Sequence, residues 1–350
     1  MTVRHVRSAL LVALASMLLG AVPAQGSGGV QAFLLAGAPD SFTDLQAHAS
    51  SVEVLYPTYY ECEPGSGSIE GHDEPAIDAY AAAHGIPLLP RFNCQDGPTV
   101  ERILGEPALR GQTLAGLYAL AANPAYAGLS LDLENAGAAD RAALSSFVAT
   151  LAGRLHAMHR KLTVVVDGVP HEEPGHATYL YDYAALSAAA DHVFVLGWGA
   201  HWEGSAPGPI APLPWVREVV AHVSSLPTAR RFVLGEPLYG LDWAVGEAGE
   251  PAAGQQAAGQ RAAGQRATAL QYSGIAALIH AVGAKPLRDR SADELTFAYQ
   301  REGIAHRVWY LDTRSILDRL KVARAAGLAI GVWRLGGEDQ SLWSSSLLAG

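Results

Sequence analysis

The clearest pattern of polar and apolar residues in the chain is a strict alternation between Gly128 and Asn135. Because the side chains of a β-strand point alternately to opposite faces, Ser130, Asp132 and Glu134 share one face and three leucines share the other. The pattern therefore predicts a strand whose polar face ends in two carboxylates.

Helical patterns flank this strand on both sides, over residues 109–121 and 140–159. In the second stretch, apolar residues recur at helical spacing: Leu144, Phe147, Val148, Leu151 and Leu155. A strand between two helices is typical of a parallel α/β sheet whose outer face is covered by helices. The leucines are then expected to contact helices, and the carboxylates to point into a barrel. An edge strand with its polar face in water stays open as the alternative.

Short apolar runs separated by helical or turn-rich stretches repeat along the whole chain. There are eight of them, at residues 30–37, 52–60, 87–92, 128–135, 162–167, 192–198, 231–235 and 328–333. Eight strands that alternate with helices are the number of a (β/α)8 TIM barrel, in which side chains at the carboxyl ends of the strands carry the chemistry. We therefore predict an α/β fold, with one barrel domain over residues 25–350.

Two segments interrupt this pattern. Residues 248–268 repeat a unit of five residues that contains Ala-Ala-Gly-Gln, which predicts a flexible surface loop, with an alanine-rich helix as the alternative. Residues 285–312 contain two strand-like runs that turn at Glu302-Gly303. This second segment predicts a small αβ insertion before the last strand.

Residues 1–24 have the pattern of a secretory signal peptide. Arg4 and Arg7 precede an apolar stretch, and small residues follow it at Val22-Pro23-Ala24. The stretch is short for an uncleaved membrane anchor, which is the alternative. We therefore expect a secreted protein, located extracellularly or in the cell wall, with no membrane span after signal removal.

The charge of the chain argues against one class of partner. The net charge is −10, and the predicted signal peptide carries two arginines and no acidic residue, so its removal makes the charge more negative. An acidic surface repels phosphate backbones, and no nucleic-acid partner is expected. We expect a monomer.

The chain has two cysteines, Cys62 and Cys94. In an exported protein a single pair is expected to form a disulfide bond. Each cysteine follows a predicted strand, and the ends of neighbouring strands lie close enough to be bridged. Two buried free thiols are the alternative.

Several separated motifs, taken together and in order, resemble glycoside hydrolase family 18. Asp132 and Glu134 hold the last two positions of the family motif Asp-x-x-Asp-x-Asp-x-Glu. Further matches are Tyr181-Asp182-Tyr183, His201-Trp202 with Pro207-Gly208-Pro209, Leu213-Pro214-Trp215, Gly235-Glu236-Pro237-Leu238-Tyr239-Gly240 and Trp333-Arg334-Leu335-Gly336-Gly337. The resemblance covers residues 30–343 and is strongest to the bacterial cell-wall branch related to spore-cortex N-acetylglucosaminidases.

This resemblance implies a retaining, substrate-assisted cleavage of β-linked N-acetylglucosamine glycans, either peptidoglycan or chitin-like. Glu134 would be the proton donor, and Asp132 would orient the N-acetyl group whose oxygen attacks the sugar carbon. The side chains expected to bind substrate are Trp333, Trp198, Tyr239, His201, Trp202 and Tyr60. The sequence contains no spacing typical of a metal site, and no metal or other cofactor is expected.

The chain also departs from the family pattern. Ala127 and Ser130 replace two acids of the strand motif, and Trp198-Gly199 stands where many members have Tyr-Asp. A tryptophan donates one hydrogen bond through its indole nitrogen but accepts none. These changes leave a catalytically silent, carbohydrate-binding chitinase-like protein as the alternative to an enzyme. Retention of both Asp132 and Glu134 favours the enzyme, because a pure binder gains nothing evident from two adjacent acids that repel each other.

Overall fold

The computed structural model of the chain describes residues 29–245 and 266–348. The predicted signal peptide and nearly all of the repeat at 248–268 lie outside the described residues. Within the described part, none of the helices is long and apolar enough to cross a membrane.

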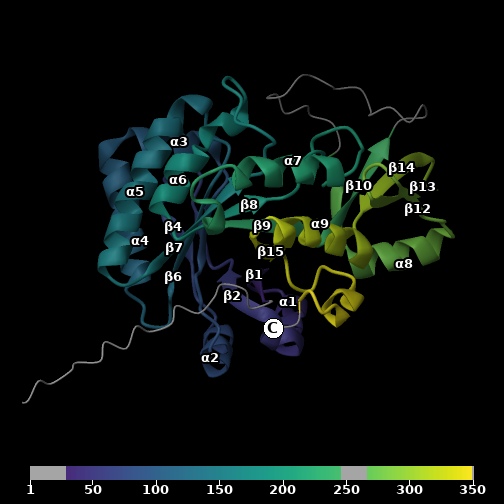
Figure 1. The fold of residues 1–350 in the computed structure, drawn as a ribbon, viewed down its shortest axis with the longest axis horizontal. Helices are drawn as coiled ribbons and strands as arrows, with labels where there is room; N and C mark the ends of the chain where they lie inside the picture. The colour runs from purple at the N-terminus through teal and green to yellow at the C-terminus, as the bar shows by residue number, and fades with distance from the viewer. Residues whose placement is uncertain (1–28, 246–265, 349–350) are drawn as a thin grey trace, which may run out of the picture.

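Eight parallel strands form the barrel, as the sequence predicts (Figure 1). They are β1 (Val30–Leu34), β2 (Val52–Pro57), β5 (Arg91–Cys94), β6 (Gly128–Leu133), β7 (Lys161–Asp167), β8 (His192–Leu196), β9 (Phe232–Pro237) and β15 (Ala329–Trp333). β15 pairs with β1, and the ring closes between β2 and β5 through a parallel bridge that joins Leu55 to Leu88. The Leu55 amide donates to the Pro87 carbonyl at 3.0 Å, and the Leu89 amide donates to the Leu55 carbonyl at 2.9 Å.

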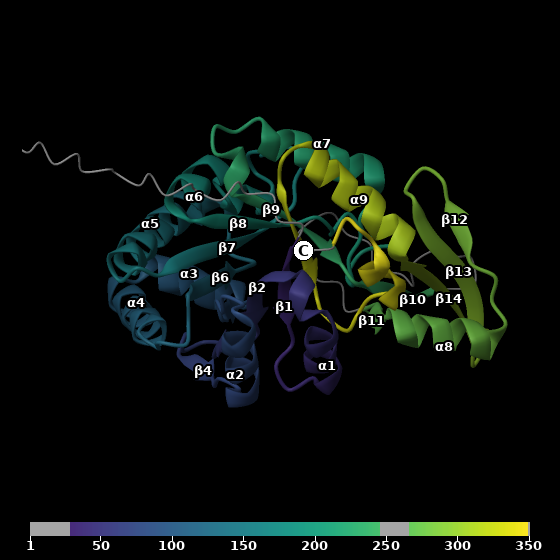
Figure 2. The same ribbon diagram turned by 60° about the horizontal axis from the view of Figure 1, so that its bottom comes forward.

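Helices cover the outside of the barrel (Figure 1, Figure 2). They are α1 (Pro39–His48), α2 (Pro75–His84), α3 (Gly97–Gly105), α4 (Pro107–Ala121), α5 (Arg141–Ala157), α6 (Tyr183–Ala189), α7 (Leu213–Ser224) and α9 (Thr313–Ala325). Proline stands in the first turn of α1, α2, α4 and α7, where its missing N–H costs no hydrogen bond. Asp96, Asp182 and Asp312 cap α3, α6 and α9 with their carboxylates.

The barrel interior has its own apolar core, separate from the core between strands and helices. Its buried members are Phe33, Val54, Tyr56, Leu89, Val165, Phe194 and Val233. The Phe194 ring lies against Gly235 and Gly331, which are register partners on β9 and β15. A Cβ atom on either glycine would lie about 2 Å from a carbon of this ring, at 2.1 Å for Gly235 and 2.2 Å for Gly331.

The predicted insertion is a separate antiparallel sheet, which lies to one side of the barrel (Figure 2). Its strands are β10 (Tyr239–Val245), β11 (Thr268–Gln271), β12 (Leu287–Asp289), β13 (Glu294–Arg301) and β14 (Ile304–Tyr310), and α8 (Tyr272–Val282) packs on it. The predicted hairpin is β13 and β14, which turn at Glu302-Gly303. The sheet also takes in β10, β11 and α8, which the sequence pattern did not assign to it.

Candidate active site

The carboxylates of β6 point into the barrel at the carboxyl ends of the strands. Asp132 is 3% exposed, and its register partner on β5 is Asn93. Glu134 follows the last residue of β6, and its amide donates to the Cys94 carbonyl at 2.9 Å. The strand is therefore not an edge strand with a polar face in water.

A buried arginine from β5 joins the two carboxylates. The Arg91 Nε donates to Oδ2 of Asp132 at 2.7 Å, and Nη2 lies 2.5 Å from the same oxygen. Nη2 also lies 3.6 Å from Oε1 of Glu134. The guanidinium carbon is 5.0 Å from the ring centroid of Trp333. Among the described residues, Oδ1 of Asp132 is buried without a hydrogen-bond partner.

Glu134 has the electrostatic environment of a proton donor. Burial, reinforced by repulsion from Asp132, raises the pKa of Glu134 to about 8. The Gln95 amide, which donates to Oε1 at 3.1 Å, and the charge of Arg91 oppose this rise. The carboxyl is therefore mostly protonated near pH 7, the state that a general acid needs.

A third carboxyl faces the same interior. Asp167, at the end of β7, is half-buried, and desolvation and repulsion from Asp132 raise its pKa to about 6. The Tyr183 hydroxyl donates to the backbone carbonyl of Asp167. The Tyr181 hydroxyl donates to the Leu133 carbonyl at 3.0 Å and so holds the end of β6.

Two of the predicted aromatic residues lie with this interior group. Trp333, the last residue of β15, is half-buried, and its ring centroid is 5.1 Å from that of Phe33. Trp198, just after β8, packs on the same interior apolar core. Trp333 contacts Arg91 and so lies beside the carboxylates.

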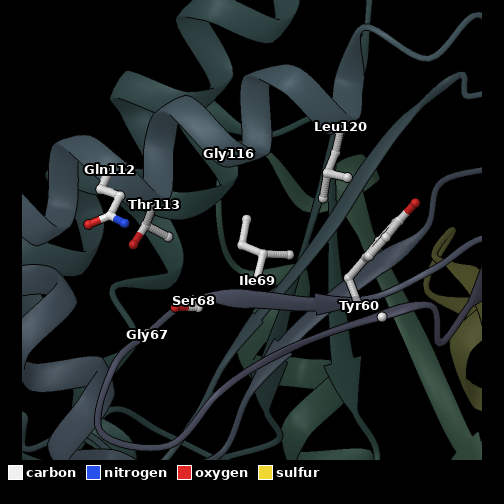
Figure 3. A pocket seen from close by; sticks show the side chains of 9 residues that line it. Tyr60, Gly67, Ser68, Ile69, Gln112, Thr113, Gly116 and Leu120 are labelled. Carbon is white, nitrogen blue, oxygen red and sulfur yellow. The ribbon is translucent and has the colours of Figure 1, made fainter.

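The structure does not bring Tyr60 to the carboxylates. Its register partner is Phe92, which packs on the outer side of the barrel, and its hydroxyl lies 2.8 Å from the Tyr126 hydroxyl. Figure 3 shows Tyr60 with Ile69 and Leu120 in a pocket of about 340 Å³ beside α4. This outward position does not fit contact with a sugar at the carboxylates.

The other three predicted substrate-binding residues lie in the loop after β8 and at the start of β10. The His201 Nδ1 pairs with the Pro209 carbonyl at 2.8 Å, Trp202 is 47% exposed, and Tyr239 begins β10. Within the described residues, no hydrogen bond or ion pair joins any of these three to Asp132 or Glu134.

Sequence reasoning missed three polar residues of the site, Arg91, Asn93 and Gln95. The segment Arg91-Phe92-Asn93-Cys94-Gln95 alternates polar and apolar residues in the same way as β6. That alternation was the signal that would have found them. Oδ1 of Asn93 is buried without a hydrogen-bond partner in the described part of the chain.

The predicted disulfide is present. Cys62, on the short strand β3 (Tyr60–Cys62), is bonded to Cys94 on β5, and their Cα atoms are 5.0 Å apart. β3 pairs with β5 and with β4 (Ile69–Gly71). The bond therefore ties the strand that carries Arg91 to its neighbour. Over the ranges 29–245 and 266–348, no group of three or more histidine, cysteine or acidic side chains is arranged to hold a metal ion.

Comparisons with known proteins agree with this geometry, although no protein-family model matches the chain. The chain is 27% identical over 302 residues to a putative sporulation-specific glycosylase, YdhD, of Bacillus subtilis, which covers 83% of this chain and 67% of the relative. It is 26% identical over 293 residues to a cortical fragment-lytic enzyme of Bacillus anthracis, covering 81% and 65%. The chain thus spans about two thirds of the length of these relatives. A chitinase from Chromobacterium violaceum superposes with a TM-score of 0.75 at 25% identity, covering 90% of this chain and 97% of that one.

The barrel, its paired carboxylates and these similarities make the chain similar to glycoside hydrolases of the family 18 type. Within that class, the similarity to a sporulation glycosylase and to cortical fragment-lytic enzymes confirms the resemblance to the spore-cortex branch.

Proposed function

We propose that this protein is a secreted glycosidase that hydrolyses β-linked N-acetylglucosamine glycans of peptidoglycan or chitin, with retention and by substrate assistance. The observation that carries the proposal is the position of Glu134, whose pKa is raised to about 8, beside an Asp132 that is ion-paired to Arg91. Two carboxyl groups held in different protonation states are the requirement for acid-assisted cleavage. The names of the relatives, among them glycosylase, cortical fragment-lytic enzyme and chitinase, support a glycan substrate.

In the proposed reaction, Glu134 transfers its proton to the glycosidic oxygen as the bond to the anomeric carbon breaks. The carbonyl oxygen of the acetamido group attacks that carbon and forms a cyclic oxazolinium ion. Oδ1 of Asp132 accepts a hydrogen bond from the acetamido N–H, and its charge stabilises the cation. Glu134, now a carboxylate, then takes a proton from water as the water opens the ring, which restores the starting protonation state.

The positions of the acids favour substrate assistance over a direct nucleophile. Asp132 and Glu134 belong to one strand, two residues apart, and one guanidinium reaches both. A direct nucleophile has to attack from the face of the sugar opposite the proton donor. Two neighbours on one strand face are poorly placed for that, so the acetamido oxygen is the nucleophile in the proposal.

A second candidate is a sugar-binding protein without turnover. The observation that favours it is Trp198-Gly199 after β8, where the family has a tyrosine hydroxyl and an acid.

The test is to incubate purified protein with peptidoglycan fragments and chitin oligosaccharides and to detect new reducing ends by mass spectrometry. We expect cleavage of N-acetylated glycans only, and a loss of at least about 100-fold in Glu134→Gln. Glu70→Gln, at an exposed position of β4, is the matched control and should keep wild-type activity. Equal cleavage of glycans with and without the N-acetyl group would exclude substrate assistance. Sugar binding without cleavage would favour the second candidate.

A further inference from the structure

The site contains a charged partner for Asp132 that comes from a different strand. Ser130, two residues before Asp132 on the same face of β6, is the register partner of Arg91 on β5. Ser130 is fully buried, and within the described residues its hydroxyl has no hydrogen-bond partner. The short serine side chain leaves the space beside β6 to the Arg91 guanidinium, which reaches along the strand to Asp132.

We propose that Arg91 is a positioning residue, which holds Asp132 ionised by one carboxylate oxygen and leaves the other oxygen free for the acetamido N–H. The inference rests on the proposed function for the role of that N–H. It assigns Arg91 no contact with substrate.

The contacts of Arg91 are specific to one carboxylate oxygen. Nε donates to Oδ2 of Asp132 at 2.7 Å, and Nη2 lies 2.5 Å from the same oxygen. Two nitrogens of one rigid, planar group hold this oxygen in place better than a single flexible ammonium would. The unpartnered Oδ1 is thereby held in a defined direction.

The position of the guanidinium is itself fixed. Arg91 is 6% exposed, and its guanidinium lies beside two aromatic rings, 5.0 Å from the centroid of Trp333 and 6.0 Å from that of Phe33. If Trp333 forms the floor for a sugar ring, the same aromatic side chain orients both the sugar and the arginine that sets Asp132.

The charge of Arg91 also separates the roles of the two carboxyls. Apart from Arg91, the titratable groups of the described residues that face Asp132 are Glu134, just after the same strand, Asp167 on β7 and the Tyr181 hydroxyl, and none of these three brings a positive charge. Without a cation, neighbouring buried acids share a proton, so that neither is reliably donor or acceptor. Arginine stays charged at every working pH, so it keeps Asp132 as the anion while Glu134 keeps the proton.

The test compares Arg91→Gln and Arg91→Lys with wild type in the full chain, using an N-acetylated glycan. For Arg91→Gln we expect kcat/KM to fall at least about 100-fold, mainly in kcat, and the acid limb of its pH profile to move up by about one unit. Arg91→Lys keeps the positive charge but loses the planar guanidinium with its several N–H donors. It should show the wild-type pH profile and only part of the wild-type kcat. Arg102→Gln, an exposed residue on α3 that pairs with Glu106, is the control and should change neither. An Arg91→Gln enzyme with the wild-type pH profile and kcat would overturn the inference.

A second measurement needs no substrate and separates the two proposals. Carbon-13 NMR of labelled aspartate and glutamate carboxyls follows the titration of the Asp132–Glu134 pair, with Asp132→Asn and Glu134→Gln used for assignment. In Arg91→Gln the first titration step of the pair should move up by at least about one pH unit. If wild type cleaves no N-acetylated glycan but this step moves, the proposed function fails and the control of ionisation by Arg91 stands. If the step does not move, the inference about Arg91 fails, whatever the activity.

Discussion

Asp132 and Glu134 are two residues apart on one strand, yet their surroundings differ. Asp132 receives two contacts from a guanidinium, whereas Glu134 receives one amide hydrogen bond and lies 3.6 Å from the same cation. Burial without full charge compensation raises the pKa of Glu134 to about 8. The cost is stability, because a carboxyl that resists ionisation in the folded protein ionises freely in the unfolded chain.

This difference predicts a pH-dependent gain of stability in Glu134→Gln. A carboxyl with a raised pKa stabilises the folded state at low pH and loses that contribution as the pH rises through 4.5 towards 8. The variant should therefore melt at least about 3 °C above wild type at pH 9 and close to wild type at pH 4.5. Calorimetry at both values measures this, with Glu70→Gln as the exposed control. A difference of the same size at both pH values would mean that packing, not ionisation, is the cause.

For single residues, the sequence predicted which side chains share a strand face and missed the contacts between residues far apart in the chain. The alternation along one strand placed Asp132 and Glu134 on one face, whereas the contact of Arg91 with Asp132 spans 41 residues and depends on the register of β5 against β6. Tyr60 fails for a related reason. The run 52–60 reads as one strand, but β2 ends at Pro57, and β3 restarts at Tyr60 against β5. The break reverses the alternation, so Tyr60 faces outward.

Among the elements, β5 presents different side chains to its two faces. Arg91 and Asn93 face the barrel interior, and Phe92 and Cys94 face outward, where Cys94 is bonded to Cys62. The strand has four residues, so it has few hydrogen bonds of its own to hold its register. The disulfide compensates by joining it covalently to β3.

We expect the double variant Cys62→Ala, Cys94→Ala to lose about 3 to 4 kcal/mol of unfolding free energy. This is the loop-closure contribution for cysteines 32 residues apart. Urea denaturation with and without reductant measures it. Reductant should lower the midpoint of wild type and leave the variant unchanged. Equal midpoints for the two oxidised proteins would show that the bond contributes nothing.

The helix α9 carries a second buried cation, outside the candidate site. Arg319 is fully buried, donates to the Ala211 carbonyl at 2.7 Å and lies 3.4 Å from Glu294 and 4.0 Å from Glu236. It connects α9 to β9 and to the first strand of the β13–β14 hairpin. The barrel and the insertion therefore share one buried ionic group.

Arg319→Met should destabilise the protein by about 3 to 5 kcal/mol, because two buried carboxyls lose their cation. Arg314→Met is the matched control on the same helix. Its side chain is 66% exposed, and the change should stay within about 0.5 kcal/mol. Chemical denaturation of both variants measures the contrast. If Arg319→Met loses no more than the control, the ion pairs contribute little beyond what methionine packing replaces.

The elements also differ in how well the sequence predicted them. All eight barrel strands follow from short apolar runs, and the β13–β14 turn follows from Glu302-Gly303, which have φ angles of 54° and 79°. The rest of the inserted sheet was missed because β10 continues directly from β9 along the chain and then pairs with β14, for example Gly240 with Tyr310. Such a distant pairing leaves no periodic signal in either segment.

Over the whole molecule, the buried acids outweigh the exposed ones in setting the pH response. Among the residues that the structure describes, burial raises the pKa of four carboxyls into the range 6 to 8, namely Glu134, Asp167, Glu294 and Glu338. The carboxyls whose pKa is lowered are Asp40, Glu106, Asp191, Asp289, Asp312 and Asp318. The first group loses its stabilising contribution as the pH rises from the ordinary range of a carboxyl towards 8, and the second loses its contribution only in acid, as the pH falls below that range.

We therefore expect the melting temperature to be highest in mild acid, at about pH 4.5 to 6, and to fall steadily up to pH 9. Calorimetry across this range at constant ionic strength tests the prediction. The variant Glu134→Gln, Glu338→Gln should flatten the fall. A melting temperature that peaks above pH 8 would show that the raised pKa values do not control the response.

The contact between the Phe194 ring and two glycines of the barrel interior, Gly235 and Gly331, limits which substitutions these positions can accept during evolution. Gly235 and Gly331 each lack the methyl group that would collide with the ring. Neither glycine can become alanine while the ring stays in place, and a smaller residue at 194 would first leave a void between two strands. A single substitution at any of these three positions is therefore expected to destabilise the folded protein. Descendants of this chain should either keep all three residues or differ at position 194 together with at least one glycine.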